Sequence, residues 1–128
     1  MREEAHNWYE QAKRDLSTAD YLLEGERLDA ASFYYQQAVE KGLKALYISA
    51  RKASPDPTHS LVKLARELGM PAERIAYLRR LTAEYYLSRY PDAVGGIPFD
   101  SYEAEGVEET AVNAHEVMQW VEQQISRY

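Results

Sequence analysis

The sequence predicts an all-α fold, an up-and-down four-helix bundle with an additional short helix. Apolar residues recur every three or four positions in several long windows, which is the spacing of buried helix faces. The six glycines and five prolines fall mainly in three clusters between those windows, and no segment alternates apolar and polar residues long enough to indicate a strand. Because the links are short, consecutive helices are expected to run antiparallel within a single domain, residues 1–128.

The first expected helix covers residues 3–24, and Gly25 is expected to end it. One helix face carries its apolar residues, which are Ala5, Trp8, Ala12, Leu16, Ala19 and Leu23. The second expected helix covers residues 28–51 and carries two apolar stripes, so we expect it to be central in the bundle and buried on two sides. A helical glycine costs about 1 kcal/mol relative to alanine, and Gly42 therefore suggests that another helix approaches closely there.

The second half of the chain predicts a short helix and two longer ones. A turn at residues 54–57 precedes a short helix, about 59–68, with Thr58 as its expected cap and Gly69 at its end. Pro71 suits the first turn of a helix over about 71–88. Residues 89–101 are expected to form a loop. The last helix is expected to begin between residues 103 and 107 and to end at 126, with a stripe of apolar residues spaced by fours and threes.

Composition excludes several classes of protein. There is no cysteine, which rules out disulfides and thiolate chemistry. No apolar run reaches the roughly 18–20 residues of a membrane span, and the charged N-terminus does not resemble a secretory signal, so we expect a cytoplasmic protein. Residues 91–128 sum to a charge of −7 and residues 1–90 to +1, so strong duplex-DNA binding is not expected. Because no motif for a metal, a phosphate-binding loop or a nucleophile is recognisable, we expect no metal and no cofactor and assign no catalytic residue.

The second helix carries one group of candidate binding residues, Gln37, Lys41 and Lys44, which share one side of the helix. Two cations with an amide nearby could meet a phosphate group. The alternative is an ordinary solvated face on which Glu40 and Lys44 form an i,i+4 ion pair. Spacing alone favours this alternative.

A second candidate group lies where the helix over 71–88 meets the following loop. Arg89 occupies this junction and Tyr90 must leave the helical region because Pro91 follows it. Asp92 could fix the Arg89 guanidinium as a structural lock or could cap the turn. Alternatively, Arg89 could serve as a binding group on a rigid scaffold. Most of the eleven tyrosines are expected to be core and interface residues; those expected near this loop are Tyr34, Tyr86, Tyr90 and Tyr102.

Several segments together resemble the HEPN domain (higher eukaryotes and prokaryotes nucleotide-binding), in its small stand-alone prokaryotic form. The resemblance spans nearly the whole chain. It rests on a W-x-x-x-A-x-x-D-L opening from Trp8 to Leu16, the run from Gln36 to Ala45, the segment from Thr58 to Leu61, Arg89-Tyr90-Pro91-Asp92, and a closing helix containing Trp120-Val121.

The resemblance implies a helical bundle that commonly forms a homodimer and that often binds a minimal nucleotidyltransferase, as in toxin–antitoxin-like pairs. Many relatives are metal-independent ribonucleases in which an Arg is followed by a His after four to six intervening residues. No His follows Arg89 in that window, so the ribonuclease mechanism is disfavoured. The resemblance still implies that Arg89 is the residue that faces phosphate.

Three functions follow as hypotheses. The favoured one is a non-catalytic bundle that binds a nucleotide and a partner protein, with Arg89, Asp92, Tyr90, Lys41, Lys44 and Gln37 as the binding residues. The second is a ribonuclease toxin whose base is another residue, such as His59 or a tyrosine. The third is a ligand-free scaffold whose acidic last third docks a basic partner.

Overall fold

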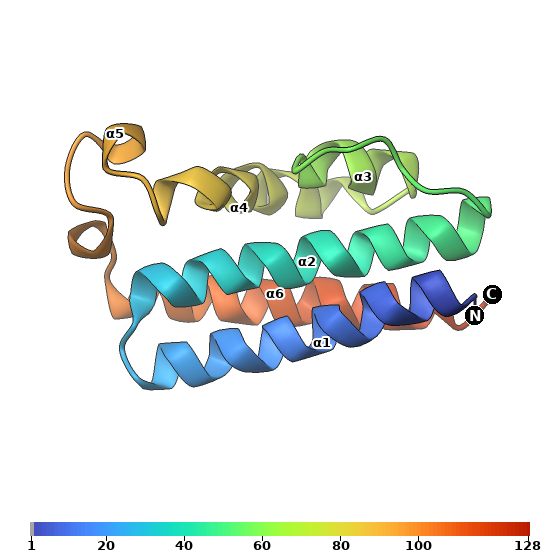
Figure 1. Cartoon of the computed structure of the whole chain (residues 1–128), viewed down its shortest axis with the longest axis horizontal. Coiled ribbons are helices and arrows are strands. Elements are labelled where there is room, and N and C mark those ends of the chain that lie inside the picture. Colours follow the sequence, from blue (N-terminus) through green and yellow to red (C-terminus); the bar gives the residue numbers. More distant parts are fainter. Residues whose placement is uncertain (1) are drawn as a thin grey trace.

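The computed structural model describes residues 2–128, and this part of the chain contains helices and no strand. The helices are α1 (Glu3–Glu24), α2 (Leu28–Arg51), α3 (Leu61–Glu67), α4 (Ile75–Leu87), α5 (Pro91–Val94) and α6 (Ala104–Ile125), with 3₁₀ turns η1 (Ala72–Arg74) and η2 (Pro98–Ser101). The four longest helices, α1, α2, α4 and α6, run up and down along one axis, and the two ends of the chain lie at the same end of the molecule (Figure 1). The predicted bundle is confirmed.

Helix α2 is the central element. It packs against α1 along its length and also against α6, α3 and α4 (Figure 1), which explains its two apolar stripes. The buried core combines large side chains of α2 with those of the surrounding helices; its largest members include Tyr35, Leu43, Ile48, Leu61, Leu64, Leu78, Leu81, Val117 and Val121.

Helix α6 packs directly against α2 at Gly42. A Cβ atom at this position would lie 2.6 Å from Sδ of Met118 and 3.8 Å from Cγ1 of Val121. The expectation of close helix packing at Gly42 is therefore confirmed, and α6 is the helix that approaches.

Two details of the predicted elements were wrong. Helix α3 begins later than expected, because Ser60 rather than Thr58 is its cap. The Ser60 side chain accepts a hydrogen bond from the backbone N–H of Lys63. The Thr58 hydroxyl instead accepts a hydrogen bond from the backbone N–H of Ser60. The expected loop over residues 89–101 contains α5 and η2, each begun by a proline in its first turn. Proline pre-sets the helical φ angle, so single helical turns form even in a segment that is rich in glycine and proline.

The described helices include none that is long and apolar enough to cross a membrane.

Candidate functional site

Arg89 lies just beyond the C-terminal end of α4, where aromatic rings surround its guanidinium group. The central guanidinium carbon is 4.5 Å from the ring centres of Phe33 and Tyr85 and 4.9 Å from that of Tyr90. Its Nε donates a hydrogen bond of 2.9 Å to the carbonyl of Tyr85, one turn earlier. The rings and the carbonyl fix the orientation of a cation that remains exposed to solvent.

A surface cavity of about 420 Å³ adjoins Arg89, where the first turn of α2, the end of α4 and η2 meet. Phe33, Tyr34 and Phe99 contribute rings to its lining, and Asp29 contributes a carboxylate. Phe99 is 64% exposed, so a flat ligand could reach its ring. Aromatic rings beside a fixed guanidinium are suited to a ligand that combines a flat ring with an anionic group.

Tyr90 and Asp92 have different relations to Arg89. Tyr90 precedes Pro91 with extended backbone angles, as expected, and its ring contacts the guanidinium. Asp92 lies exposed in the first turn of α5, and no ion pair joins it to Arg89 in the described residues. The interpretation of the two residues as a structural lock is therefore wrong, since the aromatic rings hold Arg89 instead.

Lys41, Lys44 and Gln37 lie farther along α2 and are already engaged within the chain. Lys41 forms an ion pair with the buried carboxylate of Asp15, and the Nζ of Lys44 lies 3.2 Å from the Glu40 carboxylate. Gln37 donates to the side-chain oxygen of Gln36 at 2.7 Å. The alternative i,i+4 pair of Glu40 and Lys44 thus forms. That these three residues contact a ligand stays a prediction.

Glu40 also holds His59, a contact that spacing in the sequence could not show. Glu40 is 4% exposed, and its Oε1 lies 2.9 Å from Nδ1 of His59. An ionised carboxylate can only accept, so Nδ1 carries the proton and Nε2 of the neutral ring is left as an acceptor. The His59 ring stacks on Tyr85 at 3.8 Å between centres. Tyr85 therefore touches both His59 and Arg89.

The site residues that sequence reasoning missed are chiefly Phe33, Tyr85 and Phe99. The sequence contained a signal for Tyr85, which is one helical turn before Arg89. It contained none for Phe33, because the approach of Phe33 to Arg89 depends on how α2 packs against α4. For Phe99 no signal existed, because its position depends on the path of the segment between α4 and α6.

The fold and the site together define the class of protein. It is an up-and-down helical bundle whose central helix carries a cluster of polar side chains. The family model described as the HEPN domain matches residues 5–124. The chain belongs to the HEPN domain family.

Three solved structures are similar to the chain over nearly its whole length. TT1696 from Thermus thermophilus has a TM-score of 0.88 and 29% identity, covering 96% of this chain and 99% of that one. ST0689, described as an archaeal HEPN homologue, has a TM-score of 0.82 and 31% identity, covering 98% and 99%. A HEPN domain protein from Thermotoga maritima has a TM-score of 0.75 and 26% identity, covering 96% and 100%. No curated protein matches significantly.

Proposed function

We propose that the chain is a non-catalytic domain that binds a nucleotide through Arg89 and the adjoining aromatic cavity. The observation that carries the proposal is the guanidinium that Phe33, Tyr85 and Tyr90 hold at one end of a cavity. Stacking on rings engages the faces of a guanidinium, whereas its in-plane N–H groups remain suited to two parallel hydrogen bonds to phosphate.

The aromatic lining of the cavity is suited to the base of a nucleotide. Bases stack on aromatic side chains with little dependence on sequence, and each stacked base contributes about 1–3 kcal/mol. Phe99 presents its ring to solvent at the edge of the cavity. A nucleotide with its phosphate at Arg89 and its base on Phe99 would use both features.

The test is equilibrium binding of ribonucleoside monophosphates and triphosphates, measured by calorimetry. The variant Arg89→Ala is expected to keep its helical circular-dichroism spectrum and to lose at least tenfold in affinity. Arg89→Lys keeps the charge but not the planar donor pair, so it should recover only part of the loss. Arg79→Ala is the matched control, because Arg79 is exposed on α4, the helix that precedes Arg89. Equal affinity of Arg89→Ala and the parent chain would refute the site.

The second helix offers a further comparison within the same titration. Lys44→Met removes a cation that Glu40 already neutralises. If the ligand extends along α2, as the sequence predicts for Lys41, Lys44 and Gln37, Lys44→Met should weaken binding as well. If it weakens binding as much as Arg89→Ala does, the ligand is centred on α2 and not on the aromatic cavity.

Partner binding belongs to the same proposal. Tyr86, Tyr90, Ile97 and Phe99, all within ten residues of Arg89 in the chain, expose large apolar side chains, and exposed apolar patches often mark interaction sites. We expect a homodimer and a minimal nucleotidyltransferase as the partner protein. Light scattering of the purified chain should give twice the monomer mass, and a monomeric mass would count against the dimer. Co-purification with a nucleotidyltransferase encoded nearby tests the second partner.

A ribonuclease is the second candidate function, and the contact of His59 and Arg89 with the same tyrosine favours it. Glu40 orients His59 so that Nε2 could accept the proton of a ribose 2′-hydroxyl, while Arg89 could stabilise the phosphate. Purified protein incubated with RNA and a chelator tests this function. Cleavage that His59→Ala abolishes would favour the enzyme, whereas intact RNA would leave the binding domain as the function.

A further inference from the structure

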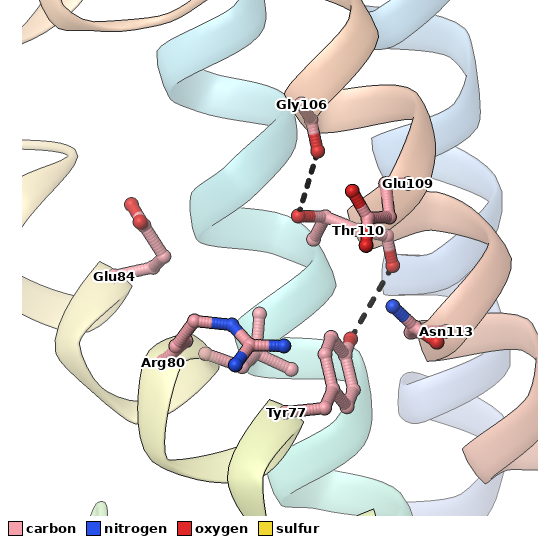
Figure 2. A pocket seen from close by; sticks show the side chains of 8 residues that line it. Tyr77, Arg80, Glu84, Gly106, Glu109, Thr110 and Asn113 are labelled. Atoms are coloured by element: carbon pink, nitrogen blue, oxygen red, sulfur yellow. Dashed lines mark hydrogen bonds between the residues drawn. The ribbon is translucent and has the colours of Figure 1, made fainter.

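A second cleft lies between α4 and α6, and its lining shares no residue with the cavity beside Arg89. It encloses about 300 Å³. Each wall is one face of a helix, with lining residues at positions i, i+3, i+4 and i+7; they are Tyr77, Arg80, Leu81 and Glu84 on α4, and Gly106, Glu109, Thr110 and Asn113 on α6 (Figure 2). Tyr77 bridges the walls by donating a hydrogen bond of 3.3 Å to the carbonyl of Thr110.

The charged side chains that line the cleft form no ion pair with one another in the described residues. Figure 2 shows Arg80 and Asn113 extending from opposite walls toward the space between the helices. Within residues 2–128, Arg80 forms no ion pair, although Glu84 follows it by one helical turn and Glu109 lines the facing wall. One guanidinium, two carboxylates and an amide are therefore available to a ligand.

Glu84 is the less exposed of the two carboxylates that line the cleft. Its carboxylate accepts a hydrogen bond from the Tyr102 hydroxyl. Burial raises the pKa of Glu84, and the Tyr102 hydrogen bond offsets only part of this shift. A cationic group of a ligand placed beside Glu84 would stabilise the ionised carboxylate.

Gly106 keeps the α6 wall open. A Cβ atom at this position would meet no heavy atom within 4 Å, so no packing contact requires the glycine. Glycine is among the weakest helix formers, and its presence in α6 leaves open space at the cleft that a side chain would occupy.

We infer that this cleft binds a free basic α-amino acid, of the arginine or lysine class. Arg80 would pair with the α-carboxylate, and Glu109 and Glu84 with the α-ammonium group and the side-chain cation. A purely anionic ligand would face two carboxylates, and a polyamine would leave Arg80 without an anion. The volume is at the small end of ligand pockets, which suits a molecule of this size.

Calorimetric titration with L-arginine and L-lysine tests the inference. We expect saturable binding of at least one of them. Agmatine lacks the carboxylate and L-norvaline lacks the side-chain cation, so each should bind at least tenfold more weakly. The inference is overturned if neither basic amino acid binds, or if agmatine binds as tightly as L-arginine.

Two variants locate the binding. Arg80→Gln should reduce affinity for the amino acid at least tenfold, while Arg79→Gln, on the neighbouring exposed residue, should leave it unchanged. Gly106→Leu should block the cleft without altering its charges; Gly96→Ala is its control, since Gly96 also has open space at the Cβ position and lies outside the cleft. Unchanged affinity in both Arg80→Gln and Gly106→Leu would place the amino acid elsewhere.

Discussion

The buried carboxylates of the bundle interior, Asp15 and Glu40, each meet a lysine of α2, and Glu40 also meets His59. Burying a carboxylate is costly unless a cation or hydrogen bonds compensate it. The two lysines therefore help to compensate buried charge, whereas Arg89, which lies over aromatic rings at the surface, remains available for an external anion.

The burial of Glu84 predicts how the stability of the chain depends on pH. Its folded-state pKa is raised above the ordinary value by burial, so the folded chain holds the proton more strongly than the unfolded chain. Its charge therefore lowers stability above that pKa, and the penalty disappears as the pH falls below the unfolded value, near 4.5. Glu84→Gln keeps an acceptor for Tyr102 and should be at least as stable as the parent at neutral pH. Chemical unfolding at several pH values should show this advantage shrinking on acidification; an advantage that grows would contradict the assignment.

At the scale of elements, the sequence predicted the long helices closely. The bounds of α1 and α2 match the expected windows, because both have clear apolar periodicity, and because α1 ends at Gly25 and α2 ends shortly before the turn at residues 54–57. The segment between α4 and α6 was not predicted, because single turns such as α5 and η2 lack a periodic pattern and depend on proline geometry.

The close contact between α2 and α6 predicts how substitutions at Gly42 change the stability of the chain. Gly42→Ala gains about 1 kcal/mol of helix propensity, which offsets the displacement of the flexible Met118 side chain, so its stability should lie within about 1 kcal/mol of the parent. Gly42→Val adds two further carbon atoms and should destabilise by about 3 kcal/mol through overpacking. Urea unfolding measures both, and adding Met118→Ala should relieve the penalty of the Gly42→Val substitution. A Gly42→Val chain as stable as the parent would show that the two helices can separate.

At the scale of the whole molecule, the sequence predicted part of the candidate site. Arg89 and Tyr90 are neighbours in the chain, so their proximity could be foreseen. The approach of Phe33 to Arg89 and of Glu40 to His59 depends on how α2 packs against α4 and the segment before α3. Lys41, Lys44 and Gln37 were identified from helix spacing, but their partners in the folded chain include Asp15 of α1, which spacing within one helix could not reveal.

The bundle has two separate openings beside α4: the aromatic cavity at its C-terminal end and the polar cleft facing α6. The central claim is that the aromatic cavity binds the nucleotide. Nuclear magnetic resonance of the isotope-labelled chain during titration with a ribonucleoside triphosphate tests it most directly. We predict saturable shifts of the amide signals of Phe33, Arg89, Tyr90 and Phe99, with those of Gly106 and Asn113 unmoved. Saturable shifts confined to the α4–α6 cleft, or no saturable shift at all, would contradict the claim.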